Sequence, residues 1–187
     1  MSDVNLESIK AVFDRSTLLH DEVEVEAAIT SMAKKITGRL KDKNPIIMCV
    51  MNGGLITTGK LLGQLHFPLQ VDYLHATRYR GKTRASNLDW QKRPSLDLKG
   101  RVVLVVDDIF DEGATLDAVV NYCTAAGGVE VFTAVLTDKL HDRKLTTLRA
   151  DFVGLTIADE YVFGYGLDYK GYFRNAAGIY AIDRGDY

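Results

Sequence analysis

The chain has 187 residues, which is enough for one domain with a proper hydrophobic core. Its apolar fraction of 47% and charged fraction of 26% are ordinary for a globular protein and exclude wholesale disorder. The net charge of -2 argues against a dedicated nucleic-acid binder, because such proteins usually carry a clear basic excess.

Helices and strands are predicted to alternate along the chain. The hydrophobic pattern predicts helices at 21–40, at 55–65 and from about 116 to the glycines at 127 and 128, and strands at 46–51, 69–77, 101–107, 129–137 and 151–158. Asp21 and Glu24 have the spacing of a capping box at the start of the first helix. The polar stretch 78–95 is predicted to lack regular structure. This order indicates an α/β domain around a mainly parallel sheet, which binds ligands at the carboxyl ends of its strands.

The segment 103–116, VLVVDDIFDEGATL, is the most informative part of the chain. An apolar strand ends at Asp107 and Asp108, Asp111 follows, and small residues open the next helix. Backbone N–H groups at such a helix start can bind a phosphate, and Thr115 adds a hydroxyl. Carboxylates suit sugar hydroxyls or a hard cation such as Mg²⁺. A ribose 5-phosphate carries both a phosphate and neighbouring hydroxyl groups, so it fits this segment.

This segment resembles the phosphoribosyl-pyrophosphate (PRPP) signature of type I phosphoribosyltransferases. From about residue 21 to residue 182, the order of segments resembles hypoxanthine-guanine phosphoribosyltransferases. The resemblance implies one α/β domain over 1–187, with a mainly parallel central sheet flanked by helices. It also implies a mobile lid at about 78–98, including Arg78 and Tyr79. A small base-binding hood would come from the N-terminal residues and from about 159–187.

The resemblance also implies a role for each site residue. The ribose and 5-phosphate group comprises Asp107, Asp108, Asp111, Glu112, Gly113, Ala114 and Thr115. The pyrophosphate group comprises Met51, Asn52, Gly53 and Arg174, with a strained or cis peptide between Met51 and Asn52. The purine group comprises Lys139 as donor to a 6-oxo group, Tyr161 for stacking, Val162 through its backbone, and Asp168. Asp111 would be the catalytic residue, and Asp107, Asp108 and Asp168 would hold Mg²⁺. Many relatives carry Lys at the position of Asn52 and Glu at that of Asp107.

The function implied is purine salvage. Phosphoribose would pass from PRPP to N9 of hypoxanthine or guanine, giving IMP or GMP and pyrophosphate. The resemblance further suggests a homodimer or homotetramer. The sequence shows no membrane-length apolar run and no secretory signal, so a cytoplasmic protein without a membrane partner is expected. Cys49 and Cys123 are expected to be core thiols, because two cysteines cannot build a disulfide framework.

Two alternatives stay open at this level. A PRPP-sensing regulator that binds RNA could use the basic stretch 78–93 with Tyr79 and Trp90, although the net charge makes a nucleic-acid partner unlikely. Residues 54–60, GLITTGK, match a nucleotide-binding P-loop, but position 61 is leucine where that loop needs a Ser or Thr hydroxyl.

Overall fold

The structure is a computed structural model that describes residues 5–78 and 88–187, except for the side chains of 77, 78 and 88. It contains a six-stranded sheet in the order β4-β3-β2-β5-β6-β7, in which only the β3–β4 pair is antiparallel. The strands are β2 Ile46–Met51, β3 Gln70–Arg78, β4 Leu88–Lys92, β5 Val102–Phe110, β6 Glu130–Lys139 and β7 Phe152–Ile157. This arrangement confirms the predicted α/β class with a mainly parallel sheet.

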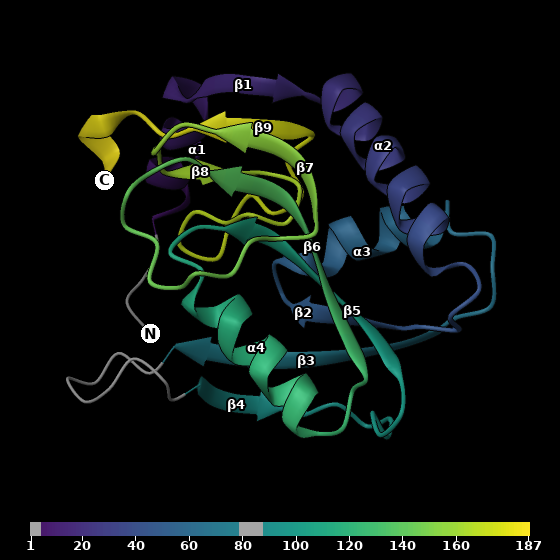
Figure 1. Ribbon diagram of the computed structural model, residues 1–187. Coiled ribbons are helices and arrows are strands. Elements are labelled where there is room, and N and C mark those ends of the chain that lie inside the picture. The colour runs from purple at the N-terminus through teal and green to yellow at the C-terminus, as the bar shows by residue number, and fades with distance from the viewer. Residues whose placement is uncertain (1–4, 79–87) are drawn as a thin grey trace.

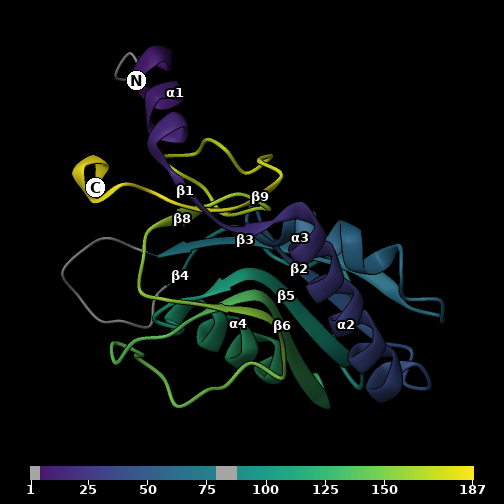
Figure 2. The same cartoon turned by 90° about the horizontal axis from the view of Figure 1, so that it is seen from above.

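Helices cover both faces of this sheet. Helices α2 (Glu22–Leu40) and α3 (Gly54–Leu62) pack on one face, and α4 (Ala114–Ala125) packs on the other (Figures 1 and 2). Successive β5 side chains alternate between the faces, so Leu104 lies in the core under α2 and α3 and Val105 in the core under α4. A strand buried on both sides is continuously apolar, which explains why β2 and β5 could be recognised in the sequence.

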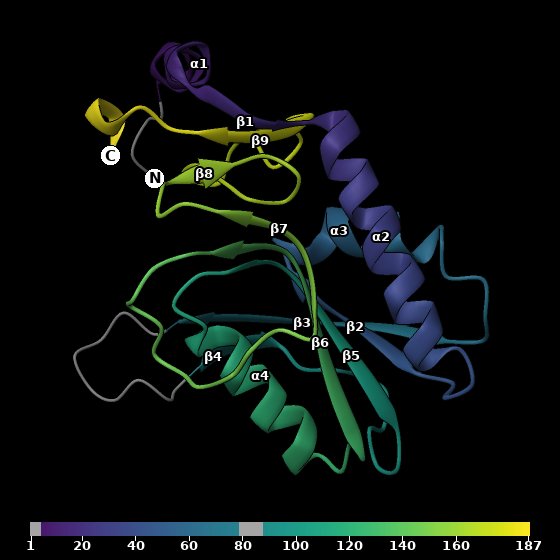
Figure 3. The same ribbon diagram turned by 45° about the horizontal axis from the view of Figure 1, so that its top comes forward.

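A second, antiparallel sheet sits above the carboxyl ends of the central strands (Figure 3). Its strands are β1 Thr17–Asp21, β9 Gly178–Ala181 and β8 Val162–Phe163, in that order, and it is accompanied by α1 Leu6–Arg15 and the short 3-10 helix η1 Arg184–Asp186. The aromatic side chains of Phe13, Phe163 and Tyr180 stack between α1 and this sheet, with ring centroids 5.1–5.6 Å apart. The segments expected to form a hood, at the two ends of the chain, thus build one small unit.

Several local predictions are confirmed. Helix α2 begins at Glu22 with Asp21 as its N-cap, and the Glu24 side chain accepts the Asp21 backbone N–H in a capping box. Helix α3 begins one residue before the predicted helix and ends at Leu62 instead of 65. Both cysteines are free and buried. No helix in the described ranges is long and apolar enough to cross a membrane.

The prediction that 78–95 lacks regular structure is wrong at 88–92. Strand β4 pairs with β3 inside that stretch, and Trp90 packs on Tyr122 of α4 with ring centroids 4.5 Å apart. The carboxylate of Asp72 fixes the chain after β4, because it accepts the backbone N–H groups of Ser95 and Leu96 at 2.6 and 2.8 Å. A short edge strand with alternating polar residues carries a weak sequence signal.

Candidate active site

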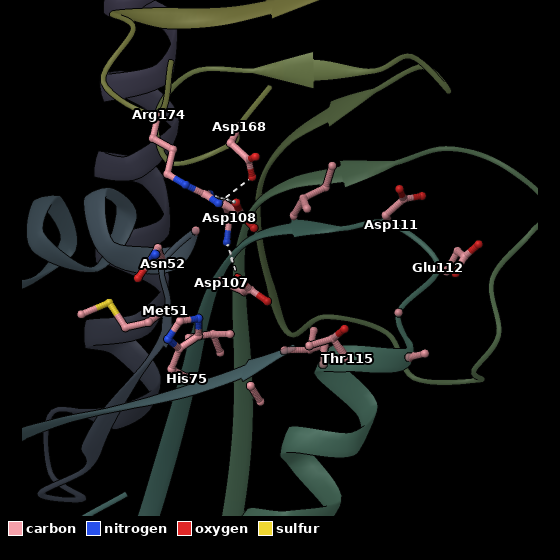
Figure 4. Close-up of a pocket in the computed structure, with 17 residues that line it drawn as sticks. Met51, Asn52, His75, Asp107, Asp108, Asp111, Glu112, Thr115, Asp168 and Arg174 are labelled. Atoms are coloured by element: carbon pink, nitrogen blue, oxygen red, sulfur yellow. Dashed lines mark hydrogen bonds and ion pairs between the residues drawn. The ribbon is translucent and has the colours of Figure 1, made fainter. Parts of the chain in front are cut away.

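A cavity of about 520 Å³ opens at the carboxyl ends of β2 and β5, beside the N-terminus of α4 (Figure 4). Its lining includes Asp168, predicted to hold Mg²⁺, and all the residues predicted to bind ribose, phosphate and pyrophosphate: Met51, Asn52, Gly53, Asp107, Asp108, Asp111, Glu112, Gly113, Ala114, Thr115 and Arg174. His75 of β3, which the sequence analysis did not select, also lines it. Segments more than 100 residues apart therefore converge on one polar cavity.

Asp107 and Asp108 form a buried acidic pair at the edge of this cavity. Strand β5 extends to Phe110, three residues beyond its predicted end, so the two carboxylates leave the strand in different directions (Figure 4). The Asp108 backbone N–H donates to Asp107 Oδ1 at 2.9 Å. Burial raises the pKa of both carboxyl groups, and the nearby charge of Asp108 raises the pKa of Asp107 further. A bound cation would favour the ionised form of both groups.

Arg174 lies between two of the acidic side chains. Its Nη2 is 2.6 Å from Asp168 Oδ1 and its Nη1 is 3.8 Å from Asp108 Oδ2. The Gly166 carbonyl accepts a further hydrogen bond from Nη1. These contacts hold the arginine in the cavity as a positive charge beside carboxylates. Such a site suits an anionic ligand that binds together with a cation, because the arginine would contact the anion and the carboxylates would contact the cation.

The residues predicted to hold Mg²⁺ fit that ion only with help from a ligand. Within 5–78 and 88–187, no group of three or more His, Cys, Asp or Glu side chains could hold a metal ion by itself. Mg²⁺ commonly takes one or two carboxylates and completes its shell with water and substrate phosphate oxygens. Asp107, Asp108 and Asp168 supply hard oxygen donors around the cavity, so they suit an ion that enters together with a phosphate ligand.

The start of helix α4 faces the cavity, and its backbone N–H groups could bind an anion there. Its N-cap residue is Gly113, so the helix has no capping side chain of its own, and the positive end of its dipole stays available. Gly113 has a φ of 83°, and a Cβ there would lie 2.5 Å from the Phe110 ring and 2.7 Å from Thr146 Cγ2. Only glycine fits this turn, and the turn aims the helix at the cavity.

The loop after β2 packs closely against the end of β5 and against the 164–174 segment. The Met51–Asn52 peptide is cis, as the family resemblance implied. A Cβ on Gly53 would lie 2.1 Å from Asp108 Oδ2, and a Cβ on Gly166 would lie 2.1 Å from the Gly53 carbonyl oxygen. The two glycines therefore bring the loop after β2, the acidic strand end and the 164–174 segment into direct contact.

A smaller cavity of about 150 Å³ adjoins the first and contains the predicted purine-binding residues. It is lined by Asp108, Ile109, Asp111, Lys139, Tyr161, Val162, Leu167 and Asp168. Lys139 is a buried residue at the end of β6, and the Tyr161 ring lies 5.8 Å from that of Tyr169. The two cavities share Asp108, Asp111 and Asp168, so ligands in both would meet at these carboxylates.

Asp111 is held by two basic side chains, one at each carboxylate oxygen. Lys139 Nζ is 3.1 Å from Oδ2, and His141 Nε2 is 2.7 Å from Oδ1. Burial would raise the pKa of Asp111, but the hydrogen bonds from His141 and Lys139 outweigh it and lower that pKa. His141 was not predicted as a site residue, and its position two residues beyond the strand-end lysine does not by itself indicate this contact.

The geometry argues against both alternative interpretations. Lys60 of the GLITTGK segment pairs with Glu26 of α2 at 2.6 Å, and residues 54–60 do not line the larger cavity. Trp90 is packed against Tyr122 and Arg93, which leaves its ring poorly placed to stack on a base. Of the predicted lid residues, Tyr79 and the side chain of Arg78 lie outside the described part of the chain.

Comparison with known proteins gives a consistent result. The family model for the phosphoribosyl transferase domain matches residues 16–170. The hypoxanthine-guanine phosphoribosyltransferase of Streptococcus pneumoniae is 35% identical over 161 residues, which cover 83% of this chain and 86% of that protein. The hypoxanthine-guanine-xanthine enzyme of Tritrichomonas foetus is 30% identical over 87% of this chain and 88% of its own.

Solved structures of similar proteins share the fold. One, a hypoxanthine-guanine-xanthine phosphoribosyltransferase, superposes with a TM-score of 0.81 at 28% identity, over 89% of this chain and 96% of its own. Another, the hypoxanthine phosphoribosyl transferase of Trypanosoma cruzi, gives 0.84 at 26% identity, over 90% and 92%.

Proposed function

The chain belongs to the phosphoribosyltransferase family, and we propose that it transfers phosphoribose from PRPP to N9 of hypoxanthine or guanine. The products would be IMP or GMP and pyrophosphate. The observation that carries this proposal is the pair of cavities that meet at Asp108, Asp111 and Asp168. The larger has a polar lining that suits a sugar with phosphate groups at two positions, and the smaller contains Tyr161 and Lys139, which suit the ring and the 6-oxo group of a purine.

Binding of both ends of PRPP would fix the sugar between them. The start of α4 supports a site for the 5-phosphate, because its backbone N–H groups and dipole favour an anion. The loop at Met51–Gly53 and the guanidinium of Arg174 would bind the pyrophosphate. Asp107 and Asp108 would accept hydrogen bonds from the ribose hydroxyls. Holding the reacting carbon between two anchored groups lowers the entropic barrier to its attack by the base.

Mg²⁺ is the cofactor that this donor set suits, held by Asp107, Asp108 and Asp168 together with PRPP oxygens. When bound, the ion would supply Lewis-acid stabilisation of the charge on the departing pyrophosphate.

Asp111 would act on the base as an ionised carboxylate. Its lowered pKa keeps it charged near neutral pH, which suits electrostatic stabilisation of positive charge on the purine and makes it a weak proton acceptor. Lys139 would donate to the 6-oxo group of the base. A lysine has no acceptor, so it cannot bond the 6-amino group of adenine. Tyr161 and Val162 line the same cavity and would contact the ring face and the purine edge.

The test is pyrophosphate release from PRPP and Mg²⁺ with hypoxanthine, guanine, xanthine and adenine supplied in turn. Release with a 6-oxopurine and not with adenine is expected. Release that is equal with all bases, or absent with all, would contradict the proposal. The lid with Arg78 and Tyr79, a homodimer or homotetramer, and a cytoplasmic location stay predictions.

A further inference from the structure

We infer that His141 is a positioning residue, which holds the carboxylate of Asp111 in place while Lys139 is engaged by the base. The inference rests on the proposed function, because it assigns His141 a task in the same reaction. His141 is not among the residues that the family resemblance assigned, and it lines neither cavity, so it acts through Asp111.

The hydrogen bonds of His141 define which ring nitrogen carries the proton. Its Nδ1 accepts the backbone N–H of Arg143 at 2.9 Å, so the proton of the neutral ring is assigned to Nε2. Nε2 then donates to Asp111 Oδ1 at 2.7 Å. The His141 side chain is only 4% exposed, so water competes little for this bond. The imidazole is therefore a fixed, buried donor aimed at one carboxylate oxygen.

The segment after β6 is itself fastened on both sides of Asp111. Lys144 Nζ donates to the Phe110 carbonyl at 2.7 Å and to Asp138 at 2.8 Å. The Leu145 backbone N–H donates to the Glu112 carbonyl at 2.8 Å. Residues 110 and 112 are therefore tied to the same segment that carries His141, so contacts outside the His141–Asp111 bond hold both of its partners in place.

Lys139 and His141 bond different oxygens of Asp111, so the histidine can hold the carboxylate after the lysine has turned to another partner. A 6-oxo base that accepts a hydrogen bond from Lys139 Nζ would draw the lysine away from Oδ2. Oδ2 would then be released toward the base, while the Nε2–H bond to Oδ1 stays intact. Without His141, engagement of Lys139 would leave Asp111 free to rotate at the moment when its charge is needed.

Two variants separate the two hydrogen bonds of the ring. His141→Asn keeps an acceptor near Nδ1 for the Arg143 N–H but has no donor that reaches Asp111. His141→Gln is long enough to present an N–H near the place of Nε2. We expect kcat to fall about ten-fold or more in His141→Asn, the scale of a lost hydrogen bond to a charged group, and to be largely restored in His141→Gln. The Kd of PRPP measured without base should stay within about two-fold in both.

Introducing His141→Asn into the Asp111→Asn variant completes a double-mutant cycle. If His141 acts through Asp111, His141→Asn should lower the residual turnover of Asp111→Asn by much less than it lowers that of the wild type. An equal fall in both backgrounds would overturn the inference, and so would unchanged kcat in His141→Asn or equal losses in the Asn and Gln variants. These results require an active wild type. A wild type without turnover on any base would refute the proposed function and His141's task with it.

Discussion

Replacement of Gly113 by alanine tests what places the start of α4, where we propose that the 5-phosphate binds. The residue has a φ of 83°, where alanine costs about 1–2 kcal/mol relative to its preferred conformations. The added Cβ would also lie 2.5 Å from the buried ring of Phe110 and 2.7 Å from Thr146, and such overpacking typically costs about 1–3 kcal/mol. We expect Gly113→Ala to lower the free energy of unfolding by about 2–5 kcal/mol.

Gly100→Ala is the matched control. Gly100 has a similar φ of 73°, but a Cβ there would meet nothing within 4 Å. This variant should lose only the conformational part, about 1–2 kcal/mol. Denaturant unfolding would measure both changes, and thermal unfolding should shift by about 2–4 °C for each kcal/mol in a chain of this size.

The two variants should also differ in function. Relief of the contact with Phe110 requires the start of α4 to move, so Gly113→Ala should raise the KM for PRPP, whereas Gly100→Ala should leave it unchanged. Equal destabilisation of the two variants would refute the packing argument. If Gly113→Ala is destabilised but its KM for PRPP is unchanged, the conformation of this turn does not determine PRPP binding.

Three further predictions concern single carboxylates and the base. Asp111→Asn should lower kcat far more than it weakens PRPP binding, and steady-state kinetics with unchanged kcat would remove Asp111 from the chemistry. Lys139→Ala should reduce the preference for 6-oxopurines over adenine, and an unaltered ratio of kcat/KM values would show that Lys139 does not read the base. Asp72→Asn should lower the free energy of unfolding at neutral pH by about 1–3 kcal/mol, because it weakens charge-assisted bonds to the backbone of Tyr73, Ser95 and Leu96. Burial raises the pKa of Asp72, but these bonds lower it on balance, so its stabilisation is present above the usual value of about 3.9 and is lost as the pH falls through the lowered folded-state pKa. Unfolding curves of wild type and variant should therefore converge in acid, and a constant gap would contradict this assignment.

The central sheet could be predicted because its signals are local. Buried parallel strands such as 46–51 are short apolar runs, and the capping box at Asp21 and Glu24 lies within one helical turn. The acidic strand end was also visible, since Asp107 and Asp108 interrupt an apolar run directly before a small-residue turn. Prediction succeeded where neighbours in sequence are also neighbours in the structure.

Elements that depend on distant partners escaped prediction. Strand β1 pairs with β9 across almost the whole length of the chain, and β8 has only two residues. The alternation of the predicted strand at 69–77 did not say which face is buried: on β3, Val71 and Tyr73 are exposed while Leu74 and Ala76 are in the core. Which face is buried depends on where the helices pack, and the alternation alone does not contain that information.

The His141 contact was missed for a similar reason. Its bond to Asp111 joins residues 30 apart, and it requires the segment after β6 to fold back over the turn that precedes α4. The sequence shows a histidine in a charged segment, which is more often a solvated loop than a buried donor. Only the packing of that segment against Phe110 and Glu112 distinguishes the two.

The pairing of β1 with β9 has a consequence for the order of assembly during synthesis. All six strands of the central sheet precede residue 158, so that sheet and the start of α4, the proposed 5-phosphate site, can form before the residues after 158 have left the ribosome. Strand β1, made among the first residues, must wait without a partner until Gly178–Ala181 emerges. The wall of the smaller cavity at Tyr161 and Val162 belongs to this late unit. A nascent or C-terminally truncated chain is therefore expected to form the start of α4, the proposed 5-phosphate site, before the smaller cavity and the Arg174 side of the larger cavity are complete.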